Sequence, residues 1–249
     1  MKRLTLRIIS ILILLVLGAC SSIDENLDTT TAEGAYKLGQ ALEKEDRYEE
    51  AIMKYQEVKN QHPYSKFATL AELAIADVHF KREAYIESQG AYQLFKDFHP
   101  KHPKIAYVTY QLGLSYFNQL PSTIDRDLTI AKKAIIYFRE VERSYSRSEY
   151  AKKATEKRNE SLKRLAQKEL YIADFYFKRE SYKSALGRYE GLLETYPNLG
   201  LDIKATYGAA VSAHRAGERN KSQSFLKKLL NKYPTSQEAS KAKREIRGS

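Results

Sequence analysis

The residue pattern that comes closest to a catalytic site is Ser224 with Lys227, a Ser-x-x-Lys spacing. In acyl-transfer enzymes with this motif the serine is the nucleophile and the lysine is a candidate base. Here the pair lies in a helix-like run beside Phe225 and Leu226, and the partner motifs of those enzymes are missing. The sequence also lacks a nucleophile elbow, a glycine-rich phosphate loop and paired carboxylates in a suitable context. We therefore expect no catalytic residues and no enzymatic activity.

A metal site is the second chemistry to consider. His99 and His102 flank Pro100 and could in principle share a metal ion. Zinc sites need at least a third protein ligand, and no further Cys, His or carboxylate is clustered with this pair. A proline-fixed turn explains these histidines better, so we expect no metal and no other cofactor.

The N-terminus has the pattern of an export signal. Residues 1–19 carry three basic residues near their start, an apolar run over residues 8–17 and small residues at their end. The run is too short to span a bilayer comfortably. Cys20 follows directly and is the one cysteine of the chain, so no intramolecular disulfide can form despite export to an oxidising compartment.

The residues from Leu17 to Cys20 resemble the lipobox that the lipoprotein signal peptidase cleaves. The resemblance implies that Cys20 becomes the first mature residue and carries acyl chains on its thiol and its new amine, which is a stable membrane anchor. By resemblance to sorted lipoproteins, a serine at position 21 where others have an aspartate implies sorting to the outer membrane. Residues 20–31, rich in Asp, Thr and Ser, then form an acylated tether. The alternative is a signal peptide that contains a cysteine by chance.

The mature chain is basic. The formal charge of the whole sequence is +11, and it falls by three when the signal leaves, because residues 1–19 hold three basic and no acidic side chains. A basic surface can bind nucleic acid, but export separates the protein from that partner. Basic residues also alternate with glutamates along helix-like stretches such as residues 152–160. We therefore expect solvated helix faces and no nucleic-acid partner; a dedicated site for an anionic ligand is the alternative.

An internal repeat organises the rest of the chain. Four prolines follow amphipathic stretches at similar turns, and 37 residues separate both Pro63 from Pro100 and Pro197 from Pro234. A fifth turn, over residues 145–148, has a similar sequence without the proline. Proline cannot continue a helix, and a period of this length marks stacked helical hairpins. The spacing therefore predicts an array of such hairpins.

Residue size follows the same period. Helices that cross closely need small residues at the crossing, and large side chains fill the space between hairpins. Twelve residues before each turn the residue is small: Ala51, Ser88, Ala134, Ala185 and Ser222. Four residues later it is large: Tyr55, Tyr92, Phe138, Tyr189 and Leu226. The preceding helix adds another small residue in each unit: Gly39, Ala76, Gly113, Ala173 and Ala210.

This pattern of sizes and turns resembles the tetratricopeptide repeat (TPR) over roughly residues 32–247. We therefore predict an all-α solenoid of about five TPR-like helical hairpins. A loop over residues 118–127 should interrupt the third repeat, and a long connecting helix over residues 148–178 should join the third repeat to the fourth. These features divide the body into N-terminal repeats 1–3, residues 32–147, and a long helix with repeats 4–5, residues 148–249.

The lipobox and the repeats together resemble the BamD family of outer-membrane assembly lipoproteins. The resemblance rests on the turns at residues 62–65 and 98–103, on the interrupted third repeat, and on residues 176–182. It implies a non-enzymatic lipoprotein subunit of the β-barrel assembly machine (BAM) on the periplasmic face of the outer membrane. The implied partners are the POTRA domains of the barrel subunit BamA, other BAM lipoproteins, unfolded outer-membrane β-barrel proteins, and the membrane itself through the acyl chains.

The resemblance also implies two binding sites. The N-terminal repeats would hold unfolded substrate in a groove whose candidate residues come from repeat position: Tyr36, Phe80, Lys81, Tyr107, Tyr110 and Phe117. Lys81 could pair with a peptide carboxylate. Arg188 matches the family's BamA-contacting arginine, and Gly187 beside it would let a partner approach closely. The alternatives are tyrosines that form a spine between repeats, a solvated Lys81 and a locally paired Arg188.

Two other functions compete with this interpretation. A TPR scaffold of envelope constriction or cell-wall synthesis, similar to the CpoB family, also has Tyr-Pro turns. That family lacks the lipobox and begins with a coiled coil, for which the tether has no heptads. A cell-wall enzyme that carries repeats would need a catalytic domain, and no segment outside the repeats supplies one. The assembly lipoprotein is the preferred interpretation.

Overall fold

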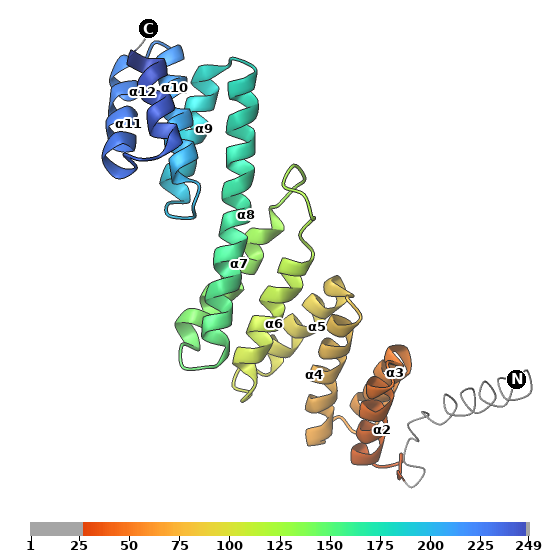
Figure 1. The fold of residues 1–249 in the computed structure, drawn as a ribbon. Coiled ribbons are helices and arrows are strands. Elements are labelled where there is room, and N and C mark those ends of the chain that lie inside the picture. The colour runs from red at the N-terminus through yellow and green to blue at the C-terminus, as the bar shows by residue number, and fades with distance from the viewer. Residues whose placement is uncertain (1–26, 248–249) are drawn as a thin grey trace, which may run out of the picture. The chain divides into compact units, whose positions relative to one another are not determined.

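The computed structural model describes residues 27–247, so the predicted signal and the acylation site Cys20 lie outside the described residues. Within them the backbone forms eleven α-helices and no strand (Figure 1). The helices are α2 (Ala32–Lys44), α3 (Tyr48–Gln61), α4 (Lys66–Lys81), α5 (Tyr85–Phe98), α6 (Ile105–Asn118), α7 (Ile130–Ser144), α8 (Tyr150–Lys178), α9 (Tyr182–Thr195), α10 (Asp202–Arg215), α11 (Arg219–Lys232) and α12 (Gln237–Arg247). None of these helices is long and apolar enough to cross a membrane. The predicted all-α fold is confirmed.

The helices follow each other as five hairpins and a final single helix, α12, as the TPR resemblance predicts. Residues 119–129 interrupt the third hairpin, between α6 and α7. The long connecting helix is also confirmed, because α8 runs without a break for 29 residues. It begins at Tyr150, two residues later than predicted, since the preceding residues form a turn in which the Ser148 amide donates to the Tyr145 carbonyl at 2.9 Å.

The described chain forms two compact units, residues 27–95 and residues 96–247, and α5 runs through the division. In the first unit α2, α3 and α4 pack against one another around one apolar core. The buried members of that core are Ala35, Leu42, Ala51, Ile52, Tyr55, Val58, Ala71, Ala74 and Val78. The domain boundary expected between residues 147 and 148 stays a prediction.

In the second unit each helix from α6 to α11 packs against the next. Apolar clusters fill the space among α6, α7 and α8, among α8, α9 and α10, and among α10, α11 and α12. Neighbouring clusters share α8 or α10, so the hairpins form a continuous stack. At its end α12 buries Ala239, Ala242 and Ile246 against Leu226 and Leu229 of α11.

The size pattern expected at the helix crossings is confirmed. The five small residues of the second helices are at most 1% exposed, and the five large residues that follow them are at most 3% exposed. A side-chain carbon on Gly113 would lie 2.7 Å from the Phe138 ring, which is closer than real contacts of this kind. The Ser222 hydroxyl donates to the Ala210 carbonyl at 3.1 Å, across two positions that the twelve-residue spacing places opposite each other.

A residue in the left-handed conformation closes the turn inside four of the hairpins. It is Asp46, Glu83, Glu180 or Gly217, with φ of 58°, 60°, 61° and 79° respectively. Its amide and the next one donate back into the first helix, as Glu83 does to the Phe80 carbonyl at 3.0 Å and Ala84 to the His79 carbonyl at 2.9 Å. Glycine is the preferred residue in such a C-terminal cap. Sequence reasoning missed the repeated cap because Gly217 alone carries the glycine signal.

The loop of the third repeat is fixed to the long helix. The Arg164 guanidinium of α8 donates to the Pro121 carbonyl, and the Lys168 ammonium one turn later donates to the carbonyls of Asp125, at 3.3 Å, and Arg126. Leu120 and Leu128, near the two ends of the loop, are buried in the core of this unit. The interruption is therefore an ordered part of the second unit.

Candidate functional site

The residues considered for chemistry do not form a reactive centre. Ser224 and Lys227 are both exposed on α11. Among residues 27–247 no group of three or more His, Cys, Asp or Glu side chains is arranged to hold a metal ion. His79 is half-buried in α4, and its Nδ1 has no hydrogen-bond partner among the described residues. Burial lowers the pKa of His79, so it packs as a neutral ring at neutral pH.

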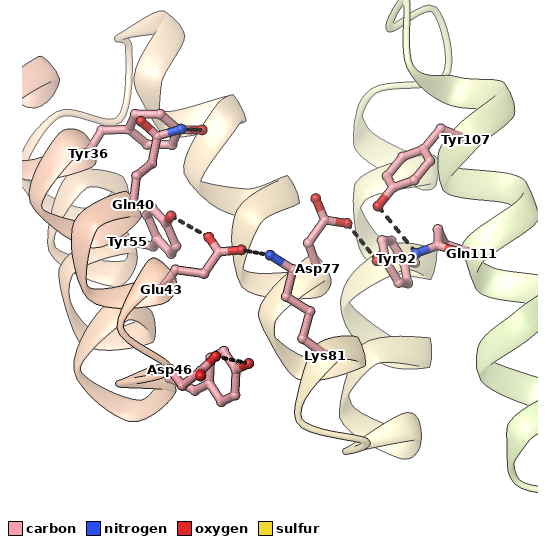
Figure 2. A network of polar contacts seen from close by, with 11 residues as sticks. Tyr36, Gln40, Glu43, Asp46, Tyr55, Asp77, Lys81, Tyr92, Tyr107 and Gln111 are labelled. Atoms are coloured by element: carbon pink, nitrogen blue, oxygen red, sulfur yellow. Dashed lines mark hydrogen bonds and ion pairs between the residues drawn. The ribbon is translucent and has the colours of Figure 1, made fainter. Parts of the chain in front are cut away.

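Two predicted groove residues, Tyr36 and Lys81, lie near the carboxylate of Glu43 in the first unit (Figure 2). The Tyr55 hydroxyl donates to Glu43 Oε2 at 2.8 Å, and the Lys81 ammonium donates to Glu43 Oε1. The Lys81 side chain is 53% exposed, whereas that of Glu43 is 15% exposed. The ring of Tyr36 packs on that of Tyr55 with centroids 5.4 Å apart. Phe80, which is half-buried, precedes Lys81 on α4.

Burial sets the ionisation of the tyrosines in this cluster. It raises the pKa of Tyr36, and the nearby Glu43 raises it further. It also raises the pKa of Tyr55, whose hydroxyl in addition donates to Glu43. Both phenols therefore stay protonated at neutral pH and act as hydrogen-bonding groups. The charged groups near these phenols are Glu43 and Asp77, and Lys81 is paired with Glu43.

Sequence reasoning missed the carboxylates that accept hydrogen bonds from the hydroxyl groups of buried tyrosines. In the second hairpin the Tyr92 hydroxyl donates to Asp77 at 2.6 Å, and in the fourth the Tyr189 hydroxyl donates to Asp174 at 2.7 Å. Each aspartate stands fifteen residues before its tyrosine and directly follows the small residue of the first helix. That recurrence is the signal that could have found them.

The other predicted groove residues lie on α6 in the second unit. Tyr107 and Tyr110 both pack against Tyr150 with centroids 5.6 Å apart. The Gln111 amide donates to the Tyr107 hydroxyl at 3.2 Å (Figure 2). Phe117 is 9% exposed and belongs to the core, so it offers little ring surface to a partner. The joint use of the two sets as one peptide groove stays a prediction, because they belong to different units.

Arg188 lies on α9 with 48% of its side chain exposed, and its Nη1 donates to Glu169 Oε2 of α8 at 3.3 Å. The local pairing left open by the sequence is therefore present, although half the side chain still faces solvent. On the same helix a side-chain carbon placed on Gly187 or Gly191 would meet no atom within 4 Å. Each glycine lowers helix stability by about 1 kcal/mol relative to alanine, and no neighbouring atom among the described residues requires it.

The geometry defines a class of protein. Each of the two compact units is built of stacked helices of TPR type, with its candidate polar groups on open helix surfaces, and repeats of this type commonly form binding surfaces for other macromolecules. A family model described as an outer membrane lipoprotein, YfiO, matches residues 28–205, and a tetratricopeptide repeat model matches residues 204–236. The chain belongs to this YfiO family of outer membrane lipoproteins.

Individual relatives carry one name, outer membrane protein assembly factor BamD. The protein from Rickettsia prowazekii is 27% identical over 234 residues, which cover 94% of this chain and 93% of that protein. The one from Caulobacter vibrioides is 30% identical over 149 residues, which cover 60% of this chain and about half, 48%, of that longer relative. The solved structure of the TPR2AB-domain:pHSP90-complex of yeast Sti1 is 14% identical, with a TM-score of 0.48, and the match covers 87% of this chain and 84% of that one.

Family membership decides several predictions made from the sequence. The resemblance to the BamD lipoproteins, the outer membrane location and the character of a non-enzymatic assembly factor are confirmed. The acylation of Cys20, the groove residues and the contact made by Arg188 stay predictions.

Proposed function

We propose that this protein is a lipoprotein subunit of the BAM complex, held to the outer membrane by acyl chains on Cys20. It binds a POTRA domain of BamA, other BAM lipoproteins, and unfolded β-barrel proteins before their insertion. The relatives named assembly factor BamD support this assignment, since one of them aligns with 94% of the chain. The protein contributes binding surfaces to this process, not chemistry.

The open face of α9 supports a contact with BamA, and it is the observation on which the proposal rests most. Gly187 and Gly191 leave the helix backbone accessible, and Arg188 stands beside them with a half-exposed guanidinium. Arginine binds a carboxylate through two parallel hydrogen bonds, and such residues often dominate an interface. A partner carboxylate can share or replace Glu169, whose bond to Arg188 is long at 3.3 Å.

The cluster around Glu43 supports substrate binding. A carboxylate of an unfolded polypeptide can compete with Glu43 for the exposed Lys81 ammonium. Half-buried rings of Tyr36 and Phe80 lie on the helices that carry Glu43 and Lys81, and they offer aromatic surface to apolar side chains. Tyr107 and Tyr110, the two half-buried tyrosines of α6, offer similar surface in the second unit.

Copurification tests the BamA contact. A tagged lipoprotein is isolated from detergent-solubilised envelopes, and wild type is compared with Arg188→Glu. The substitution places a carboxylate beside Glu169 and removes the cation, so BamA recovery should fall about tenfold or more. Lys183→Glu is the matched control, because it makes the same charge change on an exposed position of the same helix.

Both variants must retain native helix content by circular dichroism, so that a lower recovery of BamA reports on the contact between Arg188 and BamA. Equal recovery of BamA with wild type and Arg188→Glu would refute the role of Arg188. Recovery of constriction or cell-wall factors with no BamA in any sample would refute the BAM assignment and favour a CpoB-like scaffold.

Substrate binding is tested with a barrel-derived peptide that has either a free or an amidated C-terminus. Lys81→Met should remove the preference for the free carboxylate. Lys37→Met is the control, because Lys37 is 54% exposed and ion-paired like Lys81, but pairs with Glu33 at the solvent face of α2. A preference that survives Lys81→Met would exclude this lysine as the carboxylate-binding group.

A further inference from the structure

The second unit ends in a strongly basic pair of helices. Residues 219–247 contain nine basic and two acidic side chains, whereas residues 20–218 contain 30 basic and 29 acidic ones. Almost the whole net charge of the mature chain is therefore concentrated in α11, α12 and the turn between them. The alternation of charges that suggests ordinary solvated helices elsewhere does not extend to this end of the chain.

The basic side chains at this end are exposed and uncompensated. We define the C-terminal basic surface as the five residues Lys227, Lys228, Lys241, Lys243 and Arg244. All five are exposed on two helices that pack against each other, and none has an ion-pair partner among the described residues. Lys221 on the same α11 differs, because it pairs with Glu190 at 3.0 Å. Like charges held together repel one another unless an anionic partner is present.

The surroundings of these residues indicate what kind of partner fits. Protein interfaces are usually centred on aromatic or aliphatic anchors that lose water on binding. The exposed large apolar side chains of the described residues lie on other helices or turns, and α10, α11 and α12 carry none. A surface of lysines without an apolar anchor suits a diffuse layer of negative charge better than a shaped protein partner.

We propose that the C-terminal basic surface binds anionic phospholipid headgroups of the membrane that holds the lipoprotein. An outer membrane lipoprotein stays close to a bilayer, which raises the effective concentration of headgroups around it. A polybasic patch then adds to the attachment made by acyl chains. Each basic residue brought to an anionic surface strengthens binding about fivefold. The proposal rests on the outer membrane location and does not depend on the contact between Arg188 and BamA.

Vesicle binding tests the proposal without interference from the acyl anchor. The mature chain carrying Cys20→Ser is mixed with vesicles of phosphatidylcholine alone or of phosphatidylcholine with phosphatidylglycerol, at physiological ionic strength. We expect binding to the anionic vesicles alone, and a steep loss as salt rises, because salt screens exposed charges. The triple variant Lys227→Glu, Lys228→Glu, Lys241→Glu should weaken binding about a hundredfold or more.

The matched control reverses three exposed lysines elsewhere in the same unit, with Lys132→Glu, Lys133→Glu and Lys183→Glu. It has the same net charge as the test variant and should keep most of the binding. An equal loss in both triple variants would overturn the proposal, because overall charge would then explain the binding. Absence of wild-type binding to the anionic vesicles would overturn it as well.

A photo-crosslinking amino acid in place of Lys228, in intact envelopes, separates a membrane from an acidic protein as the occupant. Adducts with phospholipid would support the proposal. Adducts with a protein and none with lipid would overturn it.

Discussion

Gly113 of α6 lies against the Phe138 ring of α7, and its substitution tests whether this helix crossing needs a glycine. The methyl group of an alanine there would lie 2.7 Å from Phe138 Cε1 and 2.9 Å from Cδ1. The ring is fully buried, so it cannot move aside into solvent. Overpacking of this kind costs about 1–3 kcal/mol. Against this, alanine stabilises a helix interior by about 1 kcal/mol relative to glycine.

Gly187→Ala measures the stabilisation of a helix by alanine without a steric clash. Gly187 lies in the middle of α9, in the same unit, and a side-chain carbon there meets nothing within 4 Å. This variant should be more stable than wild type by about 1 kcal/mol. Gly113→Ala should be less stable than Gly187→Ala by the overpacking cost, about 1–3 kcal/mol.

Urea denaturation of the mature chain, followed by far-UV circular dichroism, measures both free energies of unfolding, and the dependence on urea concentration must match between variants for the comparison to hold. Adding Phe138→Leu to Gly113→Ala should cost less than the two single changes together, because leucine removes the ring that the methyl group strikes. If Gly113→Ala proved as stable as Gly187→Ala, a steric requirement for glycine at this crossing would be refuted.

Three further measurements probe other features. Glycine adopts positive φ without strain, so Glu83→Gly should raise the free energy of unfolding by about 1 kcal/mol and Gly217→Ala should lower it by about as much. Urea denaturation measures both changes, and changes of the opposite sign would show that these turns relax to another conformation. Burial lowers the pKa of His79 in the folded state. As the pH falls below about 6.5, the pKa of an unfolded histidine, His79 therefore binds a proton more readily in the unfolded state, and the free energy of unfolding decreases. His79→Gln should reduce that acid-induced loss of stability, and an unchanged pH profile would assign the loss to other groups. Arg164→Ala removes the donor to the Pro121 carbonyl and should raise amide hydrogen exchange in residues 119–129 about tenfold; unchanged exchange would mean that the buried loop ends hold the loop by themselves.

Most of the fold could be predicted because its determinants repeat along the chain. The prolines mark where second helices end, and pairs such as Ala51 with Tyr55 reveal the crossings through residue size alone. The left-handed turns could not be predicted from the sequence, because Glu83 and Glu180 occupy a conformation that glycine usually signals. Local backbone hydrogen bonds close these two turns, from the Glu83 amide to the Phe80 carbonyl and from the Glu180 amide to the Phe177 carbonyl, both at 3.0 Å, and composition carries no trace of them.

The candidate site was less predictable because its partners come from distant parts of the sequence. Arg188 could be singled out by its resemblance to a family position. Its ion pair with Glu169 depends on how α9 packs on α8 and joins residues nineteen positions apart. The contact of Lys81 with Glu43 spans 38 positions and two hairpins. Repeat periodicity indicates which residues face inward, but not which charges they meet.

The Glu43 cluster connects the core of the first unit to its surface charge. One oxygen of Glu43 accepts the hydroxyl of the buried Tyr55, and the other accepts the exposed Lys81 ammonium. The buried tyrosine therefore holds the carboxylate in place, and the carboxylate in turn holds the lysine that we propose for substrate binding. It follows that Tyr55→Phe would release Glu43 and so alter the position and availability of the Lys81 ammonium, although Lys81 itself is unchanged. A tyrosine that the sequence predicts only as a large residue between hairpins can therefore also influence a proposed binding group.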